Sequence, residues 1–583
     1  MELIKILDQK KKKYLLMIGF IIILCSILLA YNSPAKSYEL SIYASTPIAF
    51  WIGIITVIFV SLIVSFNSNS KQELTISLLL AGAAIISIVF LPIIRNYYYF
   101  GLGDSISHLG LANSILIGNI DVGEIFYPAI HLLGVFISSL TGLPLRTSMM
   151  LNITLFAGIF LLFIPLVLKN IHGKFNKDLM IIGVYSAFML LPINNISIHF
   201  QPHPSTQAVL FAPALVYLFL KYNSEKSYRF LILYILFFLG ILFIHPQQAL
   251  AFILLISTIF VWSRWYSKDK SYSIRIPLLF GLIFWMWVGY TSTFQSNIRA
   301  VFSEIFYGRF NTAEDVLQRG VSLSYLGSSI EEVIVKIFFL TLLFTFLTVV
   351  YLLKRKNYSG IDKNLIFYFV IGILPISIIV VIYLILGEGA SQAPRYIGMI
   401  QMIITITGAY SFFHLTRNIK WAYKKTLIFA FISICIILSS NTIFPSPYIY
   451  LGNSQVTQST YEGYTVAFTN YNESLKFGSV RMHSYRFYAT TQGVPEDSII
   501  RDQFLANPLD HFNNQSLSTY YESKTYLAIT ETEVKQDAEL YKGFRFSYDD
   551  FMYLERDPNI NKVQTNGDFN LFLISPKLIA NLR

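Results

Sequence analysis

Charged residues are scarce in this sequence of 583 residues, where they make up 13% of the chain and hydrophobic residues make up 54%. In a typical soluble protein, charged residues account for about 25% of the chain. Together with a mean hydropathy of +0.56, this scarcity excludes a soluble protein, because too little polar surface is available to face water. The composition indicates an integral membrane protein.

Cysteine is rarer still. The two cysteines, Cys25 and Cys435, both fall inside long apolar segments, which excludes a disulfide framework and a cysteine zinc site. The sequence also lacks a DxD pair, an HExxH motif and any Cys/His ligand set. We therefore predict no cofactor, and the sequence leaves a divalent metal open.

The formal net charge of +11 does not indicate a nucleic-acid partner. The basic residues form short clusters between apolar segments instead of covering one surface. Clusters of this kind set the orientation of membrane spans. The predicted partner of the apolar segments and their basic flanks is therefore the lipid bilayer.

Apolar segments near the ~20 residues needed to cross a bilayer recur from Tyr14 to about Ile443 and then stop. With Lys10 to Lys13 placed inside, every basic cluster falls on the inner side if the short stretch from Tyr127 to Leu140 lies in the membrane interface as an amphipathic helix. The first span is then a retained signal anchor, and an odd number of spans places the C-terminal tail outside. About thirteen spans are expected, at residues 14–31, 47–66, 75–94, 148–168, 178–194, 204–221, 229–244, 246–265, 276–292, 334–353, 365–386, 397–416 and 424–443.

Two domains follow from this pattern. Residues 1–443 are expected to form a transmembrane domain with an external loop at 95–147, and residues 444–583 an extracytoplasmic soluble domain. Within the tail, KTYLAIT predicts a strand, and Asn566 and Gly567 in VQTNGDFNLFLI predict a closing hairpin with a type I′ turn. The expected fold is a polytopic α-helical membrane protein with a C-terminal extracytoplasmic α/β domain, located in the plasma membrane with its N-terminus in the cytoplasm.

The segment GLGDSISHLG places Asp104 and His108 four residues apart, just outside a predicted span. Two glycines break the chain before Asp104, and the residues after it predict a short surface helix on which both side chains share a face. An ionisable pair at a membrane surface is costly and indicates a functional site. The carboxylate can accept a proton from an attacking hydroxyl, and the histidine can bind a phosphate or orient the carboxylate. The alternative is an N-cap, a role in which Asp after Gly is favoured.

Two further external segments carry candidate residues. In SQAPRY, Arg395 and Tyr396 enter a late span, and a guanidinium suits the phosphate of a lipid head group. The alternative is a snorkelling anchor with the tyrosine in the aromatic belt. In NNISIHFQPHPSTQ, His199, Gln201 and His203 lie among prolines near the same outer surface. The alternative there is that polar side chains merely face the interface.

Weaker candidates lie further along the external loop. Asp121 and Glu124 are carboxylates in a wet loop, where such groups are usually just solvated, and His131 lies on the predicted interfacial helix. Of the three, Glu124 is the one placed to assist a reaction at Asp104.

The order of these pieces resembles the GT-C superfamily of polytopic glycosyltransferases, in particular archaeal and bacterial relatives of the dolichyl-phosphate-mannose protein mannosyltransferases and the lipid A aminoarabinose transferases. The matching features are an aspartate before an HL pair (GDSISHLG), a YP-led interfacial helix (YPAIHLLGVFISSLTG), a span that ends in basic residues, and an external PRY before a late span. The closing NGDFNLFLI also looks like the end of the extracytoplasmic domain in archaeal members.

This resemblance implies a sugar donor carried on polyprenyl (dolichyl) phosphate, with Asp104 as the catalytic carboxylate and Arg395 near the donor phosphate. The chain departs from the family in two ways. An additional pair of spans precedes the catalytic loop, and the acidic pair of metal-dependent members is missing, which implies metal-independent chemistry.

We therefore expect a membrane glycosyltransferase, a hexosyl or pentosyl transferase, that moves a sugar from a polyprenyl-phosphate donor to a protein, lipid or glycan acceptor on the outer face. The alternatives are a lipid-linked oligosaccharide flippase or transporter and a polysaccharide polymerase or ligase. A transporter keeps charged residues near the middle of its spans, whereas the middle regions here are nearly free of charge. The expected catalytic, donor-phosphate-binding and assisting residues are, in that order, Asp104 and His108; Arg395, Tyr396 and His203; and Glu124, His199 and Gln201.

Overall fold

A computed structural model gives the fold. The structure describes residues 8–119, 125–190, 200–266, 272–291, 340–354, 361–385, 393–417, 419, 421–447, 451–482, 484–493, 503–504, 506–514 and 516–577. Three of the residues singled out in the sequence, Asp121, Glu124 and His199, lie outside these ranges.

Every predicted span coincides with a helix in the described part of the chain. Long runs of Leu, Ile and Phe favour helices here because a helix satisfies all its backbone hydrogen bonds within one segment. The helices are α1 (Gln9–Tyr31), α3 (Ile48–Asn67), α4 (Lys71–Val89), α8 (Leu145–His172), α9 (Lys177–Leu190), α10 (Pro204–Glu225), α11 (Tyr228–Ile244), α12 (Pro246–Tyr266), α13 (Arg275–Tyr290), α17 (Leu342–Leu353), α18 (Ile361–Ile385), α19 (Ala393–Thr416) and α20 (Trp421–Ser440).

Eight of these described helices are long and apolar enough to cross a membrane: α1, α3, α4, α8, α12, α18, α19 and α20. The others are shorter or less apolar, so the expected count of about thirteen crossings stays a prediction. The predicted polytopic helical membrane architecture is confirmed.

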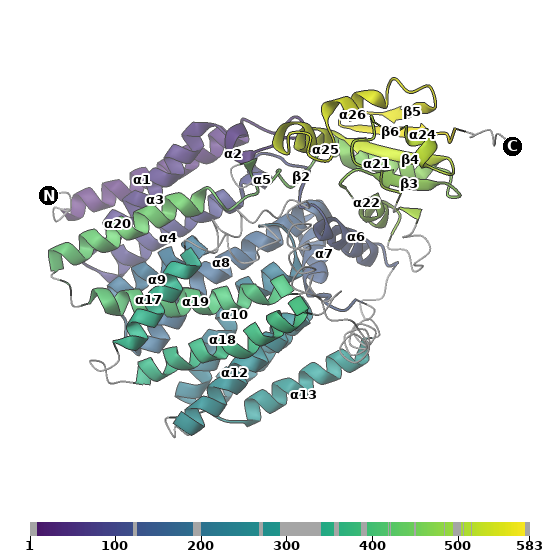
Figure 1. Cartoon of the computed structure of the whole chain (residues 1–583). Helices are drawn as coiled ribbons and strands as arrows, with labels where there is room; N and C mark the ends of the chain where they lie inside the picture. Colours follow the sequence, from purple (N-terminus) through teal and green to yellow (C-terminus); the bar gives the residue numbers. More distant parts are fainter. Residues whose placement is uncertain are drawn as a thin grey trace.

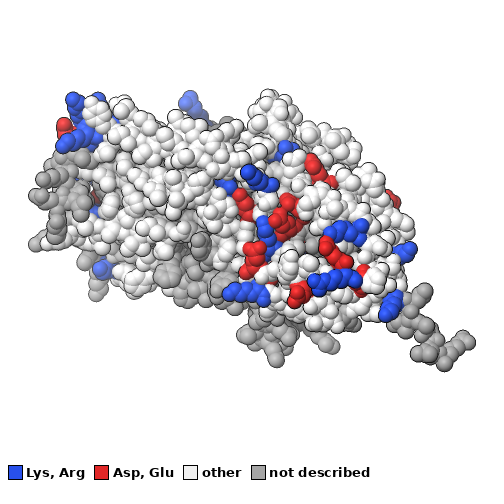
Figure 2. Space-filling view, turned by 90° about the horizontal axis from the view of Figure 1, so that it is seen from above, with Lys and Arg blue, Asp and Glu red and all other residues white. Residues whose placement is uncertain are grey.

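Basic side chains meet acidic partners at one end of the helix bundle. Lys12 of α1 pairs with Glu73 of α4 at 3.3 Å, and Lys424 of α20 pairs with Asp178 of α9 at 2.6 Å. Figure 2 shows charged side chains gathered over the tail and at the opposite end of the molecule, with a mostly uncharged surface between them. This is the charge distribution of a membrane belt between two wet ends. Which end faces the cytoplasm stays a prediction.

The external segment after α4 starts and ends at the other end of the bundle. The guanidinium of Arg146, at the start of α8, lies 4.1 Å from the ring centroid of Tyr98, near the end of α4. The segment therefore returns to the end that it left, in agreement with the prediction that its apolar helix does not cross. Two short helices, α2 (Ile42–Ser45) and α5 (Leu91–Ile94), lead to this end, and the segment itself contains β1 (Tyr99–Phe100), α6 (Asp104–Leu116) and α7 (Ala129–Thr141). Figure 1 shows α6 and α7 between the bundle and the tail.

The tail has the predicted α/β character. Its four-stranded sheet has the order β3-β4-β6-β5, in which β3 and β4 are parallel and the other pairs are antiparallel. The predicted strand KTYLAIT is β4. The tail elements are β2 (Gln455–Val456), α21 (Gln458–Asn470), β3 (Lys476–Ser479), α22 (Ser484–Thr491), α24 (Leu517–Tyr520), β4 (Thr525–Thr530), α25 (Glu531–Lys535), the π-helix η7 (Gln536–Leu540), α26 (Tyr548–Tyr553), β5 (Ile560–Thr565) and β6 (Phe569–Ile574).

The closing hairpin, β5 with β6, is confirmed, but its predicted turn type is wrong. A type I′ turn needs positive φ at both central residues, and only Gly567 has one, at +94°. The strands are joined by three residues, Asn566 to Asp568. The N–H of Asn566 donates to the backbone oxygen of Phe569 at 3.1 Å, so the two central residues of the turn are Gly567 and Asp568, one position later than predicted.

The tail is docked against the membrane domain through one face of its sheet. Tyr464 of α21 stacks on Phe487 of α22 with ring centroids 4.2 Å apart, and both belong to the same buried core as the membrane helices. A separate core that includes Phe512 and Leu527 covers the other face. In addition, β2 pairs with β1 of the external segment, where Val456 lies opposite Tyr99. The tail therefore lies in a fixed position above α6.

Candidate active site

Asp104 is the first residue of α6, and the turn before it fixes its position. Gly101 and Gly103 have φ values of +151° and +62°, which favour glycine. The N–H of Leu102, between them, donates to Oε1 of Gln201 at 3.1 Å. Gly103 is the N-cap and Asp104 is the first residue of the helix, and the Asp104 carboxylate contacts Arg486 and His203. The capping alternative is therefore wrong, and the carboxylate faces other partners.

The Asp104 carboxylate is held by one group from the membrane domain and one from the tail. Nη1 of Arg486, on α22, donates to Oδ1 of Asp104 and, at 3.3 Å, to the Ser107 hydroxyl. Nε2 of His203 lies 3.6 Å from the other oxygen, Oδ2. These two groups, His203 foremost, lower the pKa of Asp104 well below its usual range, against the opposing effect of burial. The carboxylate is therefore ionised.

His203 is held in the tautomer that can donate to Asp104. It is the N-cap of α10, where its Nδ1 accepts from the backbone N–H of Ser205 at 3.3 Å. Because Nδ1 is an acceptor, the neutral ring carries its proton on Nε2, which is the nitrogen that faces Asp104. Burial lowers the pKa of His203.

Two further histidines, His108 and His131, lie between the carboxylate and the interior of the protein. Nδ1 of His108 lies 3.1 Å from Nε2 of His131 on α7, and its ring lies 5.4 Å from that of His203. Tyr127 lies beside this group and stacks on His245 at 5.8 Å. Burial lowers the pKa of His108 well below its ordinary value and that of His131 to about 3. These imidazoles are therefore neutral at neutral pH and can pass or orient a proton without adding charge.

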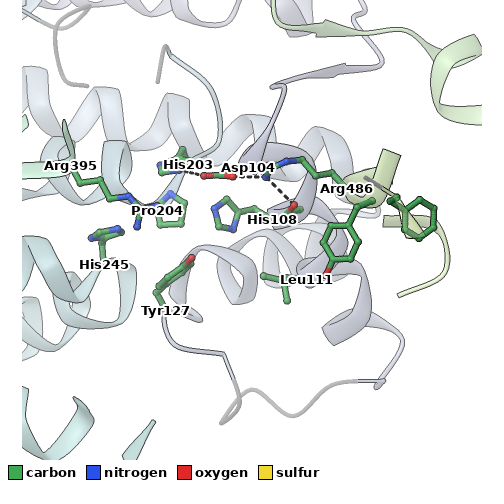
Figure 3. A pocket seen from close by; sticks show the side chains of 12 residues that line it. Asp104, His108, Leu111, Tyr127, His203, Pro204, His245, Arg395 and Arg486 are labelled. Carbon is green, nitrogen blue, oxygen red and sulfur yellow. Dashed lines mark hydrogen bonds and ion pairs between the residues drawn. The ribbon is translucent and has the colours of Figure 1, made fainter. Parts of the chain in front are cut away.

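Arg395, at the start of α19, faces the same cavity from the other side. Figure 3 shows its side chain beside His245, with His203 and Pro204 between it and Asp104. Among the described residues, no carboxylate forms an ion pair with its guanidinium. The cavity has a volume of about 380 Å³. Its lining residues are Asp104, Ser107, His108, Leu111, Tyr127, His203, Pro204, His245, Arg395, Tyr485, Arg486 and Phe504.

Four of the predicted site residues line this cavity, namely Asp104, His108, His203 and Arg395. Two others do not. Tyr396 is buried with 1% exposure, and Gln201 supports the turn before α6. Glu124 and His199 lie outside the described residues.

Of the lining residues that sequence reasoning missed, three come from the tail, Tyr485, Arg486 and Phe504, and the others come from the membrane domain: Ser107, Leu111, Tyr127, Pro204 and His245. One signal was present. Between Glu473 and Glu496 the sequence has no acidic residue but contains RMHSYR, a basic and aromatic stretch without charge partners of its own. Such a stretch indicates a binding or docking surface.

The two helices that carry Asp104 and Arg486 approach closely because α6 has a glycine at their crossing. A side chain at Gly110 would place its Cβ 2.8 Å from the backbone oxygen of Ala489 on α22. The hydroxyl of Thr490 donates to the backbone oxygen of Ile106 at 3.0 Å. The packing of α22 on α6 therefore fixes the position of Arg486 relative to the Asp104 carboxylate.

We expect Gly110→Leu to move α22 away from α6 and destabilise the docked tail by about 1 to 3 kcal/mol, the usual cost of overpacking. Limited proteolysis of the purified protein should then release the tail faster than in the parent. Gly82→Leu is the matched control, because a side chain at Gly82 on α4 meets nothing within 4 Å. Equal proteolysis of the parent and Gly110→Leu would contradict this account of the docking.

The buried histidines should make the fold less stable in acid. Their folded-state pKa values lie below the ordinary value near 6.5, so below that pH the unfolded chain binds more protons than the folded one. The free energy of unfolding then falls by about 1.4 kcal/mol per pH unit for each such proton. The carboxylate of Asp104 contributes no pH dependence above about pH 5, because both its lowered pKa in the folded protein and its ordinary pKa in the unfolded chain lie below that pH.

This dependence can be measured as the midpoint of thermal unfolding in detergent between about pH 7 and pH 5. His131→Gln should show a shallower fall than the parent, because it removes one group with a pKa near 3 in the folded state. His511→Gln, which changes a histidine in the tail whose side chain is 43% exposed, is the control. A parental slope in His131→Gln would show that the imidazole is not held neutral.

The arrangement can do two things at once. An ionised carboxylate can accept a hydrogen bond and then a proton from a hydroxyl, while a guanidinium that pairs with no carboxylate in the described part of the chain can hold a phosphate. Neutral imidazoles lie between the two. In the described part of the chain, no three His, Cys, Asp or Glu side chains are arranged to hold a metal ion.

Comparison with known proteins gives only distant likenesses. No protein-family model and no curated protein matches the sequence. The crystal structure of ArnT from Cupriavidus metallidurans bound to undecaprenyl phosphate is similar with a TM-score of 0.46 and 9% identity, over 86% of this chain and 98% of that chain. The apo oligosaccharyltransferase of Archaeoglobus fulgidus is similar with a TM-score of 0.45 and 12% identity, over 81% of this chain and 71% of that chain. These TM-scores are too low to indicate an activity, so the activity is inferred from the site residues alone.

Proposed function

We propose that this protein is a membrane glycosyltransferase that moves a sugar from a polyprenyl-phosphate donor to an acceptor at the tail side of the membrane. The observation that carries this proposal is the pairing of an ionised carboxylate, Asp104, with a guanidinium that has no described carboxylate partner, Arg395, across one cavity. The cavity opens where the apolar bundle meets the tail, which suits a donor with a prenyl chain and a polar head.

In the proposed reaction, an acceptor hydroxyl or other nucleophile attacks the anomeric carbon of the donor sugar. The bond from that carbon to the phosphate oxygen breaks, and the lipid phosphate leaves with the bonding electron pair. Arg395 stabilises the charge that develops on this phosphate, in a cavity where the low local dielectric strengthens the interaction. The proton of the nucleophile passes to Asp104.

The lowered pKa of Asp104 affects how this proton transfer takes place. A strongly ionised carboxylate is a weak base toward a free hydroxyl, whose own pKa is far higher. The hydroxyl becomes acidic only as its bond to the sugar forms. Asp104 therefore first orients the nucleophile by accepting its hydrogen bond and receives the proton late. His203 keeps the second carboxylate oxygen in place during this step.

The test is incubation of the purified protein with a panel of polyprenyl-phosphate sugars, with release of free polyprenyl phosphate as the measurement. Cleavage of at least one donor, faster with a cell-envelope extract as acceptor source, is expected. A flippase or transporter would leave every donor intact, because moving a lipid breaks no glycosidic bond. A folded protein that releases no polyprenyl phosphate from any donor would reject the proposal.

A further inference from the structure

A second cavity adjoins the first on the far side of the Arg486–Asp104 pair. It has a volume of about 250 Å³ and lies between the turn before α6 and the tail. Gly103 and Ile106 line it from the membrane domain, and residues of α22, α25 and η7 and of the segment that follows β3 line it from the tail. Arg486 lines both cavities. Whatever binds in the second cavity therefore contacts the group that holds the catalytic carboxylate.

The lining of this second cavity carries an excess of positive charge. Three arginines, Arg481, Arg486 and Arg545, line it, together with one carboxyl group, that of Glu533. Glu533 is fully buried and already accepts from the backbone N–H groups of Arg481 and Met482, each at 2.9 Å. Its burial raises its pKa, which reduces its negative charge further.

Two of the three guanidinium groups have partners that an anion could replace. Arg481 is fixed, because its Nε lies 2.6 Å from Oδ2 of Asp537 and the Asp537 side chain is fully buried. The partners of Arg486 and Arg545 are instead Asp104 and Asp510, whose side chains are 44% and 49% exposed. Ion pairs with exposed carboxylates are weak, because solvent screens the two charges. Arg545 can therefore turn toward a ligand at little cost, and Arg486 can do so when an anion takes the place of Asp104 as its partner.

A buried hydroxyl points to a ligand independently of these charges. Oγ1 of Thr532 has no hydrogen-bond partner in the described part of the chain, although the residue is 2% exposed and lines the cavity. Buried polar atoms in folded proteins nearly always have a partner. A hydroxyl in this position is available to donate to a bound oxygen.

We propose that the second cavity binds an anionic group, a phosphate or a carboxylate, through Arg486, Arg545 and Thr532. The catalytic consequence rests on the proposed function: an anion there competes with Asp104 for Arg486. A sugar acceptor that carries such a group would weaken the ion pair between Arg486 and Asp104 as it binds. Asp104 would then become a stronger base only when the sugar acceptor is present.

The test is isothermal titration calorimetry with the full chain in detergent, in an Arg395→Gln background that removes the phosphate site of the first cavity. Inorganic phosphate is titrated in one arm and dioctanoyl phosphatidic acid in the other, each at constant ionic strength. We expect saturable binding that Arg545→Gln weakens about tenfold or more, because it removes a charge-assisted hydrogen bond. Thr532→Val should weaken it several-fold, and the exposed Arg556→Gln should leave it unchanged.

Tighter binding of the phosphatidic acid would identify a lipid-borne anion as the ligand, and tighter binding of phosphate a free one; either supports the site. Absence of saturable binding in both arms, or equal binding by Arg545→Gln and Arg556→Gln, would overturn it. Because these titrations contain no sugar donor, the result is independent of whether the protein transfers sugar.

Discussion

Asp104→Asn is expected to lower the rate of polyprenyl-phosphate release by about 10²- to 10⁴-fold, the range typical of a group that takes a proton in the transition state. The amide keeps the size of the side chain and its one oxygen can still accept from Arg486, so it removes the negative charge and the proton acceptor with little change in shape. Single-turnover rates with saturating donor separate this effect from weaker donor binding.

The matched control is Asp178→Asn. Asp178 is also a carboxylate in an ion pair, with Lys424, but it lies at the opposite end of the bundle. It should retain the parental rate. If Asp104→Asn and Asp178→Asn turn over the donor equally fast, the carboxylate has no part in the chemistry. Asp104→Glu should fall between the two, because its longer side chain keeps the negative charge but displaces the carboxylate.

Arg395→Gln is expected to lower the rate of donor cleavage by about 10²- to 10³-fold, as the loss of one donor to a developing negative charge usually does. The effect should appear in kcat more than in KM, because the phosphate gains its extra charge in the transition state. Arg395→Lys should recover part of the rate, since lysine restores the charge without the two-pronged geometry.

Arg417→Gln provides the control on the same helix, because Arg417 follows the other end of α19. It should leave donor cleavage unchanged. If Arg395→Gln raises KM and leaves kcat at the parental value, Arg395 binds the donor but does not stabilise the leaving phosphate.

The parts of the site that depend on nearby residues could be predicted from the sequence. Two glycines, an aspartate and a histidine at helical spacing predict the turn and α6, and both side chains do line the cavity. The proline after His203 predicts the start of α10, which fixes His203 at a helix end. These features follow from local backbone preference, which acts over a few residues.

The rest depended on tertiary packing that no local pattern contains. Arg486 reaches Asp104 only because β2 pairs with β1 and α22 packs on Gly110, so two separate contacts must form before the two residues meet. The lowered pKa values also follow from burial and from neighbours on other elements. The sequence could therefore predict Asp104 as a candidate, but not its strong ionisation.

The distance along the chain between Asp104 and Arg486, 382 residues, also has a consequence for biosynthesis. At about 5 to 20 residues per second, a ribosome needs about 20 to 80 s to make the intervening chain. During that time the helices that hold Asp104, His203 and Arg395 leave the ribosome, while Arg486, which pairs with the carboxylate, has not yet been translated. The carboxylate therefore first meets its partner from the tail when translation is nearly complete, and a prematurely terminated product would insert as a bundle in which Asp104 lacks Arg486.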